Sequence, residues 1–176
     1  MAIIRTALKF VDSLSEISGS VGKYFALVLV GVGTFETISR HVFGAPTIWS
    51  YDTLSMAGGA LYLLGASFDY KRNAHTRVDL IYSQLPIRIR ALIDVIASLV
   101  LFFPLMTVLL WYSLTWTIKA WRTHEIMTNS FWYPIAGPYR TLMTVALLLL
   151  VLQGLAQFVR DLYMVARGKP IDNAAA

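Results

Sequence analysis

The chain has 176 residues, of which 57% are hydrophobic and only 14% are charged, with a mean hydropathy of +0.61 and a formal net charge of +5. A soluble domain of this length could not bury so much apolar surface, so the composition predicts a membrane protein. The sequence has no cysteine, which excludes disulfides, thiolate catalysis and cysteine metal sites. Its positive charges lie at the ends of apolar segments, which favours membrane topology and lipid headgroups over nucleic acid as their partners.

Residues 1–18 predict an amphipathic helix, because apolar positions such as Ile4, Leu8 and Val11 recur at helical spacing among polar residues. We expect this helix to lie along the inner membrane surface. Packing on other protein, including a partner subunit, is the alternative. The sequence shows no small-residue cleavage signature, and the next apolar segment has full spanning length, so we expect no removable signal peptide.

The first predicted membrane span covers residues 19–39, with Glu36 near its outer end. A carboxylate in a span is a functional candidate, because an ionised group in hydrocarbon is costly. Glu36 precedes Arg40 by one helical turn, which favours a paired, structural carboxylate. Gly44 and Pro46 then mark a turn in a short outer loop.

The second predicted span covers residues 49–68. Trp49 suits the headgroup boundary and Asp52 follows just inside it. Glu36, Arg40 and Asp52 could therefore form one charge cluster, which would place the first two helices side by side. Small residues on this span would let another helix backbone approach closely. They are Gly58, Gly59, Gly65 and Ala66.

A charged joint, residues 69–79, follows the second span and carries the densest set of positive charges in the chain. We expect it to be cytoplasmic. His75 and Asp79 have a spacing that could place both on one helical face and hold a metal, but two ligands alone are weak evidence for a site. More simply, Asp79 accepts from His75 or Arg77, or caps a short inner-face helix that begins at Leu80.

The third predicted span, residues 87–121, is about 50 Å long as a helix and so exceeds the membrane thickness. Its first turns should project from the inner face, or the helix must tilt. Pro104 lacks a backbone donor, which predicts a kink near mid-span. An aromatic and proline-rich outer loop, residues 123–140, follows.

The fourth predicted span covers residues 141–159, and Gln153 and Gln157 share one face near its inner end. The tail, residues 171–176, should be loose. Eleven of the fifteen Lys and Arg residues lie in the terminal segments and in the central joint with its following turn, which includes Arg88 and Arg90. Both termini are therefore predicted to be cytoplasmic. The expected fold is all-α, with a single four-helix membrane domain over residues 19–170.

The sequence offers little support for catalysis or a cofactor. All three histidines, at positions 41, 75 and 124, fall in loops or at boundaries, which argues against haem ligation inside the membrane. No nucleophile with a base, phosphate-cradling glycine loop or pair of catalytic carboxylates can be defended. Ionisable groups lie at the span edges, whereas a transport pathway needs polar groups or broken helices near mid-membrane. These patterns indicate a helper or scaffold, with no enzyme activity and no cofactor.

Four short motifs, taken in order, resemble the small membrane subunit, of the DctQ type, of tripartite ATP-independent periplasmic (TRAP) transporters. They are Ser39 to Gly44 (SRHVFG) with Trp49 to Asp52 (WSYD), Leu64 to Ala66 (LGA), His75 to Asp79 (HTRVD) with Leu85 and Pro86, and Leu150 to Gly154 (LVLQG) running into Arg160 and Asp161. Together they extend over about two-thirds of the chain. Two departures are Asp52, where the family is expected to have Glu, and Gly137-Pro138, in place of a Pro-x-Gly order.

The resemblance implies a bacterial inner-membrane complex in which this chain braces a larger, roughly twelve-span subunit that carries substrate and sodium. A periplasmic binding protein would deliver an organic acid, and this chain would bind no substrate itself. The residues implied to tie the first two helices on the outer side are Glu36, Arg40, Trp49 and Asp52. The inner joint would be set by Arg72, His75 and Asp79, and helix or partner contacts by Gly58, Gly59, Gly65, Ala66 and Gln153.

Two other classes remain open from the sequence. One is a self-sufficient four-helix, proton-coupled exporter that uses Glu36, as small multidrug-resistance carriers use a glutamate well inside their first span. The other is a membrane anchor for a redox enzyme, which would require haem or quinone. The position of Glu36 near the end of its span argues against the exporter.

Overall fold

A computed structural model describes residues 2–72, 86–128 and 131–168 of the chain. The predictions for His75 and Asp79, for a short helix from Leu80 and for a loose tail fall outside these residues. Four lengths of helix dominate the described part, and one of them is interrupted by a π-helical turn. The elements are α1 (Ala2–His41), α2 (Ser50–Lys71), α4 (Ile87–Ala97), the π-helical turn η1 (Ser98–Phe102), α5 (Phe103–Arg122) and α6 (Ala136–Arg167).

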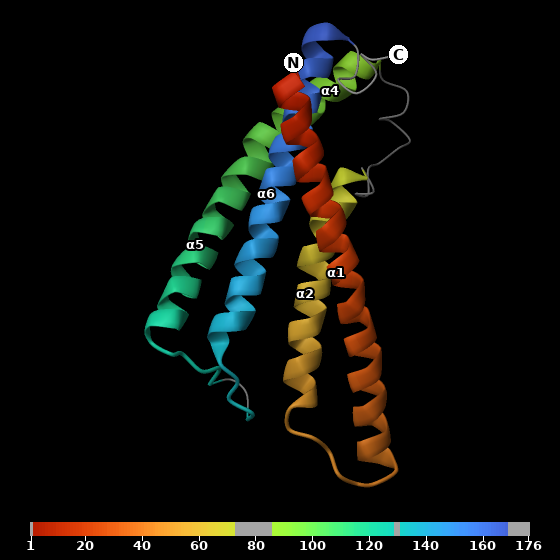
Figure 1. The fold of residues 1–176 in the computed structure, drawn as a ribbon, viewed down its shortest axis with the longest axis vertical. Helices are drawn as coiled ribbons and strands as arrows, with labels where there is room; N and C mark the ends of the chain where they lie inside the picture. Colours follow the sequence, from red (N-terminus) through yellow and green to blue (C-terminus); the bar gives the residue numbers. More distant parts are fainter. Residues whose placement is uncertain (1, 73–85, 129–130, 169–176) are drawn as a thin grey trace.

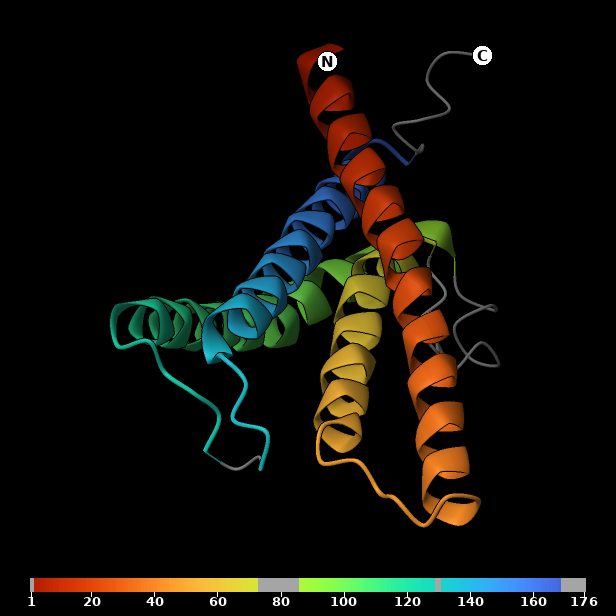
Figure 2. The ribbon, with the colours of Figure 1, turned by 60° about the horizontal axis from the view of Figure 1, so that its bottom comes forward.

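The all-α fold class is confirmed for the described residues, which contain no strand beyond an isolated bridge between Ile126 and Ile135. The helices form two antiparallel pairs, α1 with α2 and α5 with α6 (Figure 1). The pairs meet at the end where α1 begins and α6 finishes, and they separate toward the end that holds the two connecting loops (Figures 1 and 2). The start of α1 and the end of α6 therefore lie at one end of the bundle.

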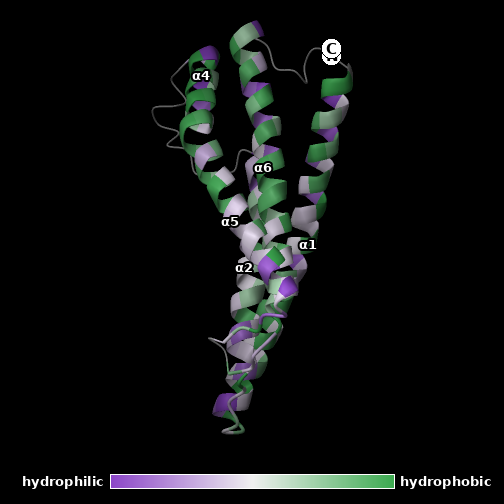
Figure 3. Cartoon of the chain, turned by 90° about the vertical axis from the view of Figure 1, so that its left-hand side faces the viewer, coloured by the Kyte–Doolittle hydropathy of each residue, from purple (hydrophilic) through white to green (hydrophobic). Residues whose placement is uncertain are grey.

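Among the described residues, three helical segments are long and apolar enough to cross a membrane: Ile3–His41, Ile87–Arg122 and Ala136–Arg167. Hydrophilic residues lie at the lower tips of the hairpins and recur along α4 (Figure 3). The α2 helix is not among the three, although its 22 residues span about 33 Å. The prediction of a fourth span therefore depends on α2.

No break separates residues 2–18 from the first predicted span, since both belong to the single helix α1. At 40 residues this helix is about 60 Å long, roughly twice the thickness of the hydrocarbon core. Its first turns pack on α6 of the same chain, where Leu8 and Ala156 are buried together with Val11 and Tyr163 beside them. The sequence left open whether this helix lies along the membrane surface or packs on protein. The described contacts favour packing on protein, and that protein is α6 of the same chain.

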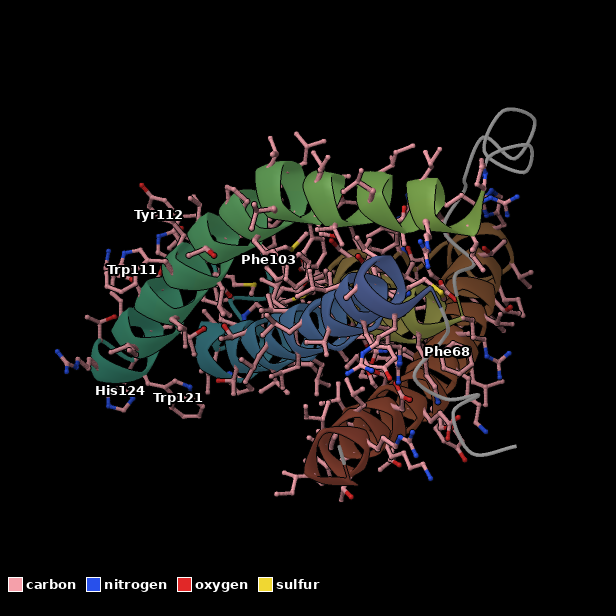
Figure 4. All side chains as sticks on the ribbon, turned by 90° about the horizontal axis from the view of Figure 1, so that it is seen from above. Phe68, Phe103, Trp111, Tyr112, Trp121 and His124 are labelled. Atoms are coloured by element: carbon pink, nitrogen blue, oxygen red, sulfur yellow. The ribbon has the colours of Figure 1, made fainter. Side chains whose placement is uncertain are left out.

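The third helical segment bends where η1 joins α4 to α5 (Figure 4). The bend adjoins Pro104, at which the sequence predicts a kink. Proline has no N–H to donate to the carbonyl of Val100, so the regular hydrogen-bond ladder cannot continue there.

The ring of Phe102, within η1, lies directly on Gly154 of α6: a Cβ built on Gly154 would come within 2.2 Å of it. Phe103 stands edge-on to Phe158 of α6 at 5.3 Å between ring centres.

The α6 helix extends beyond the predicted span, residues 141–159, at both ends. It begins at Ala136 because Pro138 sits in the first turn, where its missing N–H has no intrahelical partner to lose. The predicted loop, residues 123–140, is accordingly shorter. The helix ends at Arg167, and Gly168 forms a left-handed cap with φ of 68°.

Candidate functional site

The carboxylate of Glu36 closes the α1/α2 pair at the end of the bundle that holds the two connecting loops. We call this end the outer end and the opposite one the inner end. Its Oε1 accepts from Nη2 of Arg40 at 2.6 Å. Its Oε2 accepts from the backbone N–H of Thr47 at 3.2 Å and from the hydroxyl of Ser50 at 2.9 Å. Thr47 also donates its hydroxyl to Oε2 at 2.5 Å. The ion pair expected between Glu36 and Arg40 is present, and the same carboxylate holds the loop and the first residue of α2.

The connecting loop is shaped for this closure. Gly44 adopts a positive φ of 62°, which a residue with a side chain rarely adopts. The Ser39 hydroxyl donates to the carbonyl of Ala45 at 2.5 Å, and the Ala45 N–H donates back to the Ser39 carbonyl at 3.0 Å. Trp49, the residue before α2, stacks on Phe35 with 5.9 Å between ring centres. The short loop thus fixes α2 against α1.

At the opposite end of the bundle, α1 and α6 are joined by what we call the inner polar cluster, made of Asp12, Ser15, Gln153 and Arg160. Asp12 accepts from Nη2 of Arg160 at 2.6 Å through Oδ2 and from Nε2 of Gln153 at 3.2 Å through Oδ1. Ser15 donates to Oε1 of Gln153 at 2.7 Å. Gln153 is fully buried, and both polar groups of its amide are satisfied.

The inner ends of α1 and α2 are held by serine hydroxyls and a charge pair. Ser18 donates to the carbonyl of Leu64 at 2.7 Å, and both serine and leucine are buried. Lys71 pairs with Glu16 at 2.6 Å. Arg72, one of the residues assigned to the inner joint, lies over the ring of Phe68 at 4.1 Å from its centre. The three helices α1, α2 and α6 are thereby connected at this end.

The outer end of the α5/α6 pair carries its own ion pair, between Glu125 in the loop and Arg140 on α6. The contact is bidentate, with Nη1 at 2.9 Å and Nη2 at 2.8 Å from the two carboxylate oxygens. The Arg140 hydrogen bonds lower the pKa of Glu125 from its ordinary value. Trp116 of α5 lies beside Arg140, at 5.8 Å from the guanidinium to the ring centre.

The middle of the α5/α6 pair is held by neutral hydroxyls. Thr144 shares hydrogen bonds with Ser113 at 2.7 Å and with Thr117 at 2.8 Å. A cavity of about 470 Å³ lies beside these groups, lined mainly by apolar and aromatic side chains such as Leu109 and Trp116. The charged residue in its wall, Arg140, is paired with Glu125. Figure 4 shows Trp111 projecting outward from α5, whereas Tyr112 contributes to the lining of the cavity.

The predicted small residues of α2 divide into different surroundings. A Cβ on Gly59 would come within 2.6 Å of Tyr139 and Met143 on α6, so this glycine serves a contact within the chain. Gly58 has only Leu29 near it, at 4.0 Å, and Gly65 has nothing within 4 Å. Ala66 is half-buried, and Asp52 is in the first turn of α2.

Sequence reasoning found Gln153 but missed the partners that it meets. Asp12, Ser15 and Arg160 come from segments that were read as an interfacial helix and a terminal charge. The sequence did hold a signal for these partners. Leu8, Asp12 and Ser15 follow one another at helical spacing, so the two polar residues share a helix face with Leu8, which is buried. Within residues 2–72, 86–128 and 131–168, no group of three or more His, Asp or Glu side chains is placed to hold a metal.

Most of the chain matches the sequence pattern of a known protein family. The family described as tripartite ATP-independent periplasmic transporters, DctQ component, matches residues 29–163. The chain belongs to this family. It is thus a component of a transporter family whose members are not classed as enzymes, and a multi-pass membrane protein.

Two relatives of the chain bear names from the same transporter class. The C4-dicarboxylate TRAP transporter small permease protein DctQ of Vibrio cholerae is 27% identical over 125 residues, which is 68% of this chain and 50% of that protein. The sialic acid TRAP transporter permease protein SiaT of Haemophilus influenzae is 26% identical over 95 residues, which is 54% of this chain and 15% of that protein. The chain therefore spans half the length of one relative and a small part of the other.

Proposed function

We propose that this chain is the small permease subunit of a TRAP-type secondary transporter in a bacterial inner membrane. It braces a larger membrane subunit during sodium-coupled uptake of an organic acid that a periplasmic binding protein delivers. The observation that carries the proposal is the family match over residues 29–163. On this proposal, the larger subunit and the binding protein determine which substrate is transported.

The Haemophilus relative supports the idea of a larger partner. Its matched segment makes up only 15% of a longer permease chain, so most of that permease has no counterpart in this chain. We infer that a separate membrane subunit supplies the missing part here. This chain would then act as the small helical portion beside it.

The helix-end contacts support a bracing role. Glu36, the carboxylate on which an exporter would depend, is bound by Arg40, Thr47 and Ser50 at the outer end of its helix. The groups in the middle of the α5/α6 pair are neutral hydroxyls that bond one another. A carboxylate that must exchange protons with a solute needs access to water and to that solute. A carboxylate held by donors from Arg40, Thr47 and Ser50 serves instead to fix helices.

The proposal includes four membrane spans, with α2 as the second, and cytoplasmic termini. Cysteine labelling suits this chain because its sequence has no cysteine of its own. We expect a membrane-impermeant thiol reagent added to intact spheroplasts to label Phe43→Cys in the outer loop and to leave Ile3→Cys unlabelled. Both side chains are exposed. Labelling of Ile3→Cys alone would reverse the orientation, and labelling of both from outside would show that α1 does not cross the membrane.

Reconstitution tests the activity. Liposomes that contain the chain together with the proposed larger subunit should take up an organic acid when a sodium gradient and the binding protein are supplied. Liposomes with the chain alone should move neither an organic acid nor a cationic dye. Dye transport by the chain alone, driven by a proton gradient and abolished by Glu36→Gln, would contradict the bracing role and favour the exporter.

A further inference from the structure

The α2 helix has a buried side and, opposite to it, a stripe that no described part of the chain covers. The buried residues, which face α1 and α6, are Ser50, Ala57, Ala60, Leu64 and Ser67. At 100° per residue, the positions on the other side form what we call the α2 stripe. It consists of Tyr51, Ser55, Gly58, Tyr62, Gly65 and Asp69.

The contacts show that this stripe is open. A Cβ added to Gly65 would meet no atom within 4 Å, and one added to Gly58 would meet only the end of Leu29 at 4.0 Å. Tyr51 and Tyr62 are 80% and 77% exposed. Ser55 and Asp69 are exposed as well. The glycines therefore leave gaps along the stripe, with hydroxyl and aromatic groups standing between them.

Hydrocarbon is a poor cover for such a surface. Tyr62 lies twelve residues after the start of α2, or about 18 Å along a helix that crosses a core roughly 30 Å thick, so its hydroxyl would stand near mid-membrane. A hydroxyl without a hydrogen-bond partner in hydrocarbon is costly. Consistently, α2 is not apolar enough to qualify as a lipid-facing span, whereas Ile3–His41, Ile87–Arg122 and Ala136–Arg167 do.

The spacing of the stripe fits a helix as its occupant. Successive members are four, three, four, three and four residues apart, the alternation by which two helices pack at a crossing angle of about 20°. Gly58 and Gly65 provide the depressions that admit side chains from a neighbouring helix in a membrane. The α2 stripe thus combines a helical register, open depressions and hydrogen-bonding groups at the depth where lipid offers none.

We propose that the α2 stripe is the surface on which a membrane-spanning helix of the larger permease subunit packs, an inference that rests on the proposed function. That helix carries a hydrogen-bond acceptor opposite Tyr62 and bulky aliphatic side chains over Gly58 and Gly65. Packing of this kind also makes α2 a stable span, since protein replaces lipid along its polar side.

Two glycines give a matched pair of variants. Gly31 on α1 and Gly65 on α2 both have nothing within 4 Å of an added Cβ, so a side chain at either position begins in open space. The measurement is recovery of the larger subunit when the tagged small chain is purified from membranes that contain both. We expect Gly65→Leu to lower recovery at least tenfold and Gly31→Leu to leave it at the wild-type level, with equal amounts of each small chain in the membrane.

Tyr62→Phe removes only the hydroxyl and should lower recovery by a smaller factor without altering the amount of small chain. Full recovery with both Gly65→Leu and Tyr62→Phe would overturn the proposal while leaving the function intact, because the larger subunit still binds elsewhere. Loss with Gly31→Leu alone would move the interface to α1 and also overturn it. A wild-type chain that recovers no larger subunit would contradict the proposed function itself.

A second copy of the chain is the competing occupant. Because the natural sequence lacks cysteine, Ser55→Cys supplies a single thiol on the stripe. Oxidation of membranes that contain both subunits should give little cross-linked dimer of the small chain. A dimer formed in most of the chains, with wild-type recovery in Gly65→Leu, would assign the stripe to self-association and overturn the proposal.

Discussion

At the inner end of the bundle, polar side chains join helices from both hairpins, whereas at the outer end each hairpin is closed by contacts within itself. Asp12 of α1 binds Arg160 and Gln153 of α6 across the two pairs. By contrast, Glu36 binds only its own helix, the adjoining loop and α2, and Glu125 binds Arg140 within the α5/α6 pair. The difference explains why the pairs meet at one end and separate at the other (Figure 1).

This division assigns separate tasks to the two ends. Polar contacts at the inner end, together with the packing of Gly59 on Tyr139 and Met143, set the relation of α1/α2 to α5/α6. Polar contacts within each pair at the outer end fix each loop. A perturbation of the inner polar cluster should therefore change the whole bundle, and one at an outer ion pair should stay local.

The largest effect is expected from removing Asp12. Asp12→Ala leaves the Arg160 charge and the buried Gln153 amide without their acceptor, which should lower the free energy of unfolding by about 3 kcal/mol. Unfolding in mixed detergent measures this. The double variant with Arg160→Ala should lose much less than the sum of the single changes. Additive losses would show that the two side chains do not interact.

The second largest loss of stability is expected from disturbing the packing of η1 on α6. Gly154→Ala places a methyl group against the ring of Phe102, which must move, at a cost of about 2 kcal/mol in unfolding free energy. Replacing Phe102 with Leu in the same chain should restore part of the loss. Gly31→Ala, at an open position, is the control and should change stability little. An equal loss of stability at both glycines would show that the contact with the Phe102 ring is not the cause.

A smaller, local effect is expected at the outer end of the α1/α2 pair. Glu36→Gln removes the charge that Arg40, Thr47 and Ser50 share, so amide exchange in residues 42–49 should rise on the order of tenfold. Exchange in residues 123–135 should not change. A rise in both loops would contradict the independence of the two outer ends.

The smallest effect depends on pH and concerns the α5/α6 loop. Arg140 lowers the pKa of Glu125 below its usual value of 4.5. A carboxyl group with a depressed pKa contributes stability above that usual value and loses it as the pH falls through the lower, folded-state pKa. Amide exchange in residues 123–135 should therefore increase only below about pH 4.5. Glu125→Gln should abolish this pH dependence, and an onset near neutral pH would exclude Glu125 as its source.

Local features of the sequence predicted much of the outer end. Glu36 and Arg40 are one turn apart, and Gly44 marks the turn, so the ion pair and the loop follow from neighbours in the chain. The Glu125–Arg140 pair was not predicted, although both residues lie within the predicted loop, residues 123–140, because nothing in a loop sequence fixes which side chains meet.

The sequence by itself determined that the chain enters a membrane, that it is helical, and that its positive charges gather at the chain ends and the central joint. These properties follow from composition and short-range periodicity, which act within one or two helical turns. The tertiary structure decided that Asp12 meets Gln153 across 141 residues, that Phe102 lies on Gly154, and that one side of α2 is left open. Such contacts depend on how whole helices cross, and helix crossing is set by the sum of many weak contacts that no local pattern records.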